Sequence, residues 1–170
     1  MLRDYDEILP GRLWVGSYVE PEEIGLLKQI GITSIVSLQS DRDLMAYSIS
    51  ADDMQQACAA LGIEFRRAPV LDFDPEALSQ NLDNCVREVE KAAARPSARI
   101  YLHCTAGKNR APTVAAAFLM RTRDLSALQA FEYLIGRRDC QPYLSVLEKY
   151  EETFGRGIDK GDPEPSSTEA

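Results

Sequence analysis

The sequence predicts a single α/β domain in which a central mixed sheet is flanked by helices. Short apolar segments rich in β-branched residues alternate with longer amphipathic segments, which is typical of this class. Proline and glycine stand at the ends of these segments, where chain reversals are needed. A length of 170 residues suits one domain with its own core. We therefore expect a folded domain over 1–155 and a disordered acidic tail over 156–170.

The strands are expected where short apolar runs are bounded by turn residues. The run Ile-Thr-Ser-Ile-Val-Ser-Leu is the clearest, because β-branched side chains suit a buried strand. The segment 99–103 is apolar and short, which favours the centre of the sheet. The expected strands cover 13–16, 32–38, 63–70 and 99–103.

The helices are expected from their capping residues. Pro21 occupies a tolerated first position and Gly31 ends that segment. Ser50 resembles an N-cap of a helix that Gly62 closes, and Ser126 with its glutamine partner forms a capping-box pattern. The long segment 75–94 carries apolar residues at helical spacing, and Cys85 among them is expected in the core. The expected helices cover 21–30, 51–61, 75–94, 112–121, 126–135 and 143–154.

Composition excludes several classes of function. The net charge of −8 argues against a broad nucleic-acid or anionic-membrane surface, although a small cationic pocket can still bind an anion. Four scattered cysteines and one histidine argue against a disulfide framework and against a structural zinc site. No apolar N-terminal segment indicates a signal peptide, and the longest apolar run is half a membrane span. These features predict a reducing, cytoplasmic environment.

The segment from Cys104 to Arg110 joins a predicted strand to a predicted helix that Pro112 opens. Successive backbone N–H groups in such a strand–loop–helix unit form an anion site at a helix N-terminus. Gly107 allows the tight turn, and the planar guanidinium of Arg110 can hold two phosphate oxygens. The predicted phosphate-binding residues are Thr105, Ala106, Gly107, Lys108, Asn109 and Arg110. A cysteine in this electropositive loop is expected to act as a thiolate nucleophile.

Other interpretations of the loop fit less well. A cysteine protease needs a histidine in contact with the thiol, but His103 is the adjacent strand residue and should point to the opposite face. A Walker loop needs glycine at Leu102 and a hydroxyl residue at Asn109. A bare Cys-x5-Arg could be accidental, whereas His-Cys-x-Ala-Gly-x-x-Arg between a strand and a helix is a specific signal.

The segment 103–110 resembles the signature of the cysteine-dependent dual-specificity phosphatases, and the resemblance extends over about 13–150. It implies a single dual-specificity-phosphatase-like domain with this loop between a strand end and a helix N-terminus. It also implies that Cys104 attacks phosphorus, that Arg110 stabilises the transferring group, and that no metal takes part.

A proton donor for the leaving oxygen is expected in the segment 72–75. Asp74 immediately precedes Pro75 and the long helix, so N-capping is its natural role. Asp72 has no structural role in the sequence pattern and matches the general-acid position of the resembled family. We therefore expect Asp72 to act as the acid and then as the base toward water.

Ala111 stands where most of that superfamily has serine or threonine, which predicts slower breakdown of a phosphocysteine. The same Arg-Ala-Pro resembles the plant starch-excess-type, laforin-like glucan phosphatases, and further matches lie at 15–17, 38–44, 72–74 and 137–142. Aromatic residues in that family stack on glucose rings. The matching positions are Tyr47 and Phe73, with Tyr5 a weaker third, and ordinary loop anchoring remains open for them.

The resemblance implies a phosphorylated substrate, with glucan ranked first and phosphoprotein second. Lys108 also suits a phosphoinositide, although these enzymes usually carry a second basic residue where Thr105 stands. A pseudophosphatase that binds phosphate or glucan without turnover is the non-enzymatic alternative. No nucleic-acid partner and no membrane span are expected, and the sequence leaves the oligomeric state open.

Overall fold

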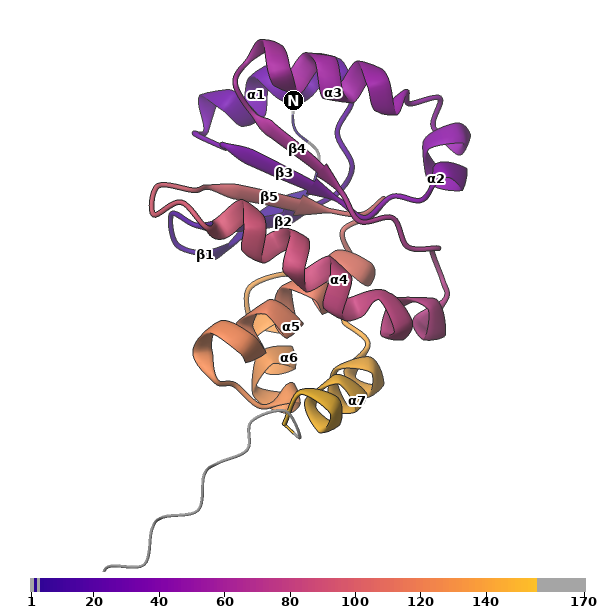
Figure 1. Ribbon diagram of the computed structural model, residues 1–170, viewed down its shortest axis with the longest axis vertical. Helices are drawn as coiled ribbons and strands as arrows, with labels where there is room; N and C mark the ends of the chain where they lie inside the picture. Colours follow the sequence, from indigo (N-terminus) through magenta and orange to yellow (C-terminus); the bar gives the residue numbers. More distant parts are fainter. Residues whose placement is uncertain (1, 3, 156–170) are drawn as a thin grey trace, which may run out of the picture.

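The computed structural model describes residues 2 and 4–155, and its centre is a five-stranded sheet (Figure 1). The strand order is β1-β2-β5-β3-β4, with β1 antiparallel to β2 and the other neighbours parallel. The expected mixed sheet is therefore confirmed, and β5 lies at its centre as predicted. The strands are β1 (Tyr5–Leu9), β2 (Leu13–Gly16), β3 (Ser34–Ser37), β4 (Glu64–Arg67) and β5 (Ile100–His103).

Two elements of the structure are not predicted by the sequence. β1 contains two acidic residues and only two buried ones, so its sequence does not show the alternation of apolar and polar residues that predicts a strand. Pairing with β2 nevertheless makes it an edge strand, because the backbone hydrogen bonds do not depend on its side chains. α2 (Asp41–Ala46) is a short helix with a single buried residue, too short for a periodic signal.

The remaining helices match the predicted ones with small shifts of their ends. Ser50 caps α3 and Ser126 forms a capping box with Gln129, both as expected. α5 begins at Arg110 instead of Pro112, because a proline is tolerated anywhere in a first turn, where N–H groups have no intrahelical acceptor. The helices are a 3-10 turn (Pro21–Glu23), α1 (Ile24–Gln29), α3 (Ala51–Ala60), α4 (Pro75–Ala93), α5 (Arg110–Arg123), α6 (Ala127–Ile135) and α7 (Leu144–Gly155).

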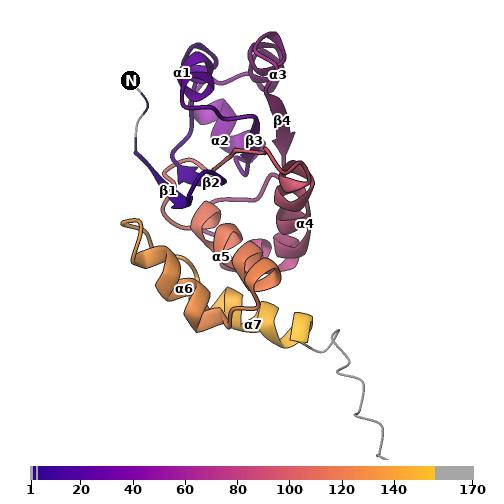
Figure 2. The ribbon, with the colours of Figure 1, turned by 90° about the vertical axis from the view of Figure 1, so that its left-hand side faces the viewer.

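The helices cover both faces of the sheet (Figures 1 and 2). α1 and α3 lie on one face, and α4 and α5 lie on the other, with α6 and α7 outside them. Alternate residues of the strands supply the two cores, so that Tyr101 joins one cluster and Leu102 the other. Cys85 lies in the second of these cores, as predicted.

The carboxyl ends of the four parallel strands meet at one edge of the sheet. The segments after β2, β3, β4 and β5 therefore converge there, which is where open α/β sheets bind ligands. α2 lies at this edge in Figure 1. Within the described residues, no helix is long and apolar enough to cross a membrane. The predicted tail 156–170 lies outside the described part of the chain.

Candidate active site

The predicted phosphate-binding loop follows β5 and leads directly into α5, at the carboxyl edge of the sheet. Four of its carbonyl oxygens are held by the surrounding scaffold. The four tethered carbonyls are Thr105 O, bound by Tyr18 N at 2.9 Å, Gly107 O, bound by Arg138 Nε at 2.9 Å, Lys108 O, bound by Gln141 N at 2.8 Å, and Asn109 O, bound by Thr113 N at 3.0 Å and Thr113 Oγ1 at 2.7 Å.

The N–H groups of the same peptide units point the other way, because C=O and N–H are antiparallel in a trans peptide. Among the described residues, no acceptor is found for the backbone N–H groups of 105–110. The loop therefore presents a set of unpaired donors on the side away from the scaffold. Such a set at a helix N-terminus is suited to a phosphate group.

Gly107 is the residue that lets the loop turn against β2. Its φ of +67° lies in the left-handed region, and a Cβ there would stand 2.5 Å from the carbonyl carbon and oxygen of Gly16. Any side chain would push the loop off the sheet, so glycine is required by both conformation and space.

Arg110 is 1% exposed and is oriented by groups from three segments. Its Nη1 pairs with Asp43 Oδ2 at 2.8 Å and donates to Val70 O at 2.7 Å. Its Nη2 pairs with Asp72 Oδ2 at 2.9 Å and donates to Thr105 Oγ1 at 3.3 Å. The guanidinium is thus held beside the loop by groups of the protein itself.

Asp43 is a site residue that the sequence analysis misses. It lies in the first turn of α2, where it completes a capping box with Ser40. Partial burial acts to raise the pKa of Asp43, but hydrogen bonds from Arg110 and Ser40 outweigh it and lower the pKa overall. The Ser-x-x-Asp spacing of a capping box is the signal that could have located this helix.

Asp72 and Asp74 occupy different environments. Asp74 Oδ1 accepts from Ala77 N at 2.9 Å and caps α4, as predicted. Asp72 lies in the segment after β4, with Oδ1 accepting from Phe73 N at 3.0 Å and Oδ2 on Arg110. The structure therefore brings Cys104, Arg110 and Asp72 to the same edge of the sheet.

The cysteines are all unpaired thiols and all buried. Burial raises the pKa of Cys58 and of Cys140 to about 11, and that of Cys85 to about 12. These three are therefore neutral thiols at physiological pH. Cys104 is 3% exposed and stands between β5 and the loop.

His103 packs on the face of the sheet opposite to Cys104, as predicted, with its ring 5.9 Å from that of Tyr101. Its Nδ1 lies 2.9 Å from Cys104 O and donates to it, which leaves Nε2 unprotonated. Burial lowers the pKa of His103 to about 4, so the imidazole is neutral near pH 7.

Comparison with known proteins agrees with this geometry. Residues 13–152 match the family described as "Dual specificity phosphatase, catalytic domain". The chain belongs to this family.

Individual relatives cover the chain to different extents. It is 31% identical over 147 residues to phosphoglucan phosphatase DSP4, amyloplastic, of Castanea sativa, covering 85% of this chain and 39% of that protein. Phosphoglucan phosphatase LSF1, chloroplastic, of Arabidopsis thaliana is 26% identical over 132 residues, covering 77% of this chain and 22% of that protein. The chain thus spans well under half the length of these two relatives. The crystal structure of human DUSP28 has 25% identity and a TM-score of 0.67, covering 91% of this chain and 97% of that one.

The predicted aromatic residues of this dual-specificity phosphatase domain differ in their surroundings. Phe73 is 84% exposed, has a φ of +55° and lines a cavity of about 310 Å³ together with Asp72 and Asp43. Tyr47 packs against Tyr18, with ring centroids 4.6 Å apart, and is 45% exposed. Tyr5 stands edge-on to buried Tyr101 in β1. Of these three aromatic residues, Phe73 is the one that lines this cavity with Asp72 and Asp43.

The Lys108 side chain binds Asp139, which lies outside the loop. Its Nζ donates to Asp139 O at 2.6 Å and pairs with Asp139 Oδ2 at 2.9 Å. The hydrogen bond from Lys108 lowers the pKa of Asp139, and the same bond raises the pKa of Lys108. The ammonium group is thus already engaged with a surface carboxylate.

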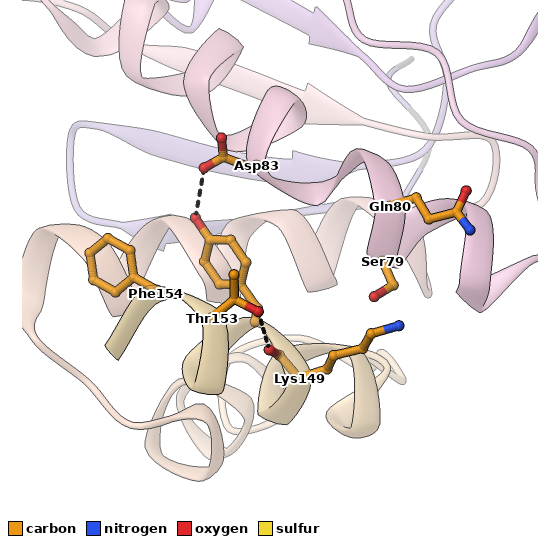
Figure 3. Close-up of a pocket in the computed structure, with 7 residues that line it drawn as sticks. Ser79, Gln80, Asp83, Lys149, Thr153 and Phe154 are labelled. Atoms are coloured by element: carbon orange, nitrogen blue, oxygen red, sulfur yellow. Dashed lines mark hydrogen bonds between the residues drawn. The ribbon is translucent and has the colours of Figure 1, made fainter. Parts of the chain in front are cut away.

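A second cavity of the domain, about 480 Å³, lies between α4 and α7 (Figure 3). Two hydrogen bonds join its lining residues: Tyr150 Oη donates to Asp83 Oδ1 at 3.4 Å, and Thr153 Oγ1 donates to Lys149 O at 3.1 Å. None of its lining residues belongs to the loop or to the segment of Asp72.

Proposed function

We propose that the domain hydrolyses phosphomonoesters through a phosphocysteine intermediate and that its substrate is a phosphorylated glucan. The observation that carries the reaction is the loop itself, in which tethered carbonyls leave a set of N–H donors between Cys104 and the fixed guanidinium of Arg110. These groups supply the nucleophile, the phosphate cradle and the charge stabilisation.

The reaction runs in two displacements. The Cys104 thiolate forms a bond to phosphorus while the bond to the substrate oxygen breaks, and Asp72 gives that oxygen its proton. Asp72 then takes a proton from water, whose oxygen attacks phosphorus and releases the thiolate and inorganic phosphate. No step calls for a metal ion.

Arg110 changes partners during this cycle. In the structure its two terminal nitrogens contact Asp43 and Asp72. A bound phosphate competes with Asp72 for Nη2, which frees the Asp72 carboxyl to approach the leaving oxygen. Asp43 is 13% exposed and stays in place to orient the guanidinium.

The substrate proposal rests on Phe73, Ala111 and the relatives named as phosphoglucan phosphatases. A solvent-exposed ring beside a phosphate pocket offers a flat apolar surface for a sugar face. The cavity next to it is lined by Arg42 and three aspartates, which are suitable partners for sugar hydroxyls. Free thiols suit a reducing compartment, in line with the cytoplasmic expectation.

Phosphate release from solubilised phosphoglucan, measured beside a phosphotyrosine peptide and phosphoinositide vesicles, tests the proposal. We expect the wild type to act on phosphoglucan most efficiently and Cys104→Ser to lose all turnover. A wild type that hydrolyses none of these and no small aryl phosphate is a pseudophosphatase, which contradicts the reaction. Preference for the peptide or the lipid contradicts the glucan assignment alone.

Phe73→Ala separates the aromatic contact from the chemistry. We expect it to lower glucan kcat/KM about tenfold while leaving p-nitrophenyl phosphate turnover within about twofold, because only the sugar contact is lost. Tyr47→Ala is the comparison, and its effect should be smaller because that ring packs on Tyr18. Unchanged glucan activity in both variants removes the aromatic argument.

A further inference from the structure

Arg138 is a buried charged side chain that the proposed reaction does not use. It follows α6, and its side chain is 0% exposed. Its Nε donates to Gly107 O at 2.9 Å, Nη1 pairs with Asp6 Oδ2 at 2.7 Å, and Nη2 pairs with Asp4 Oδ2 at 2.9 Å. One guanidinium thus joins the phosphate-binding loop to the N-terminal segment.

We propose that Arg138, held by Asp4 and Asp6, is a positioning residue that fixes one N–H group of the phosphate-binding loop. This inference rests on the proposed function. The peptide unit concerned joins Gly107 to Lys108, whose C=O and N–H point in opposite directions. Holding Gly107 O on the scaffold side keeps the Lys108 N–H on the ligand side.

Among the described residues, the donor to Gly107 O is a side chain, whereas the other three tethered carbonyls of the loop each accept from a backbone N–H. Thr105 O and Lys108 O are bound by backbone N–H groups, and Asn109 O is bound within the first turn of α5. Gly107 also has the most conformational freedom of the loop residues, so its peptide rotates most readily when the carbonyl is released. We therefore expect loss of Arg138 to disturb the orientation of the Lys108 N–H more than that of the other loop donors.

The charges of the cluster argue for positioning and against direct attraction of the substrate. Arg138 contributes one positive charge, while Asp4 and Asp6 contribute two negative ones. Lys108 Nζ also lies 3.6 Å from Asp4 Oδ2 and pairs with Asp139, which adds one positive and one negative charge. The connected cluster therefore keeps one net negative charge and does not attract an anion, so its benefit to phosphate binding must come from geometry. Asp4 and Asp6 both precede residue 13, where the family match begins, so this clamp uses β1 and the segment before it.

The test compares Arg138→Met with Arg137→Met, which alters the neighbouring, exposed arginine that lies over the Tyr133 ring. The readouts are kcat and KM for p-nitrophenyl phosphate, the inhibition constant of orthovanadate, and Tm. We expect Arg138→Met to weaken orthovanadate binding and lower kcat by about tenfold to a hundredfold, because a misoriented N–H costs less than complete loss of one oxyanion donor, which costs about a hundredfold to a thousandfold. Arg137→Met should match the wild type.

Asp6→Asn is the deciding variant, since it keeps the shape of the side chain and retains Arg138 but removes one of the two charges that hold it. If Arg138 acts by position, loosening it weakens orthovanadate binding. If it acts by charge, removing a carboxylate tightens orthovanadate binding, which overturns the proposal. An Arg138→Met protein that is folded and binds orthovanadate within twofold of the wild type also overturns it. Wild-type turnover is measured first, because its absence defeats the proposed function instead.

Discussion

Asp72 and Asp74 show how two identical side chains, separated by one residue, acquire different tasks. Asp74 is committed to the N-terminus of α4, where its carboxylate satisfies Ala77 N. Asp72 contacts the guanidinium of Arg110 and is 23% exposed, so it can both reach a ligand and exchange protons with water. The difference follows from the position of Pro75, which sets where the helix begins.

The two variants Asp72→Ala and Asp74→Ala should therefore differ in kcat and in stability. We expect Asp72→Ala to lower kcat about a hundredfold on phosphoglucan and less on p-nitrophenyl phosphate, whose leaving group needs no proton. Asp74→Ala should cost about 1 kcal/mol of stability, seen as a lower urea midpoint, with a smaller change in kcat. A larger kcat loss in Asp74→Ala would reverse the assignment of the acid.

At the scale of elements, α2 supplies a partner of Arg110, although in its sequence only the capping-box spacing marks the helix. Its first turn supplies Asp43 to Arg110, while Asp41 Oδ1 pairs with Arg67 Nη2 at 2.8 Å on the surface. Leu44 is its single buried residue, so hydrophobic periodicity cannot reveal the helix. Its cap could be inferred from spacing, but the pairing with Arg110 depends on tertiary contacts.

Asp43→Asn tests this element. We expect kcat/KM to fall about tenfold, because Arg110 loses a charged partner that fixes its plane, while the asparagine oxygen can still accept from Ser40 N. Asp41→Asn, in the same turn and 88% exposed on its side chain, is the matched control and should leave kcat/KM unchanged. Tighter phosphate binding with unchanged kcat in Asp43→Asn would mean that this carboxylate only opposes the ligand.

At the scale of the molecule, the site forms because parallel strands end at one edge. The sequence predicts Cys104, Arg110 and Asp72 from local signals, namely a strand end, a glycine turn and a proline-started helix, together with the family resemblance. It does not locate Asp43 or the Arg138 cluster, because their partners are 67 residues away for Asp43 and 132 or more for the carboxylates of Arg138. Such contacts are set by strand order, which local patterns do not encode.

The central position of β5 also makes the whole domain sensitive to acid through His103. Its pKa is about 4 in the folded protein, against an ordinary value of 6.5, because burial opposes the charged form. Below pH 6.5 the unfolded chain therefore binds more protons, and stability falls as the pH drops toward 4.

We expect this group to remove about 2 kcal/mol of unfolding free energy between about pH 7.5 and pH 5. The chain has one histidine, so no other imidazole titrates in that window. His103→Asn keeps a side-chain N–H for Cys104 O and should show a flatter pH dependence in urea unfolding, even if its stability at neutral pH is lower. The carboxylates contribute equally to both proteins and cancel in the difference. An equal pH dependence in the variant would show that the imidazole has the same pKa in the folded and unfolded states, and that burial at the centre of the sheet does not lower it.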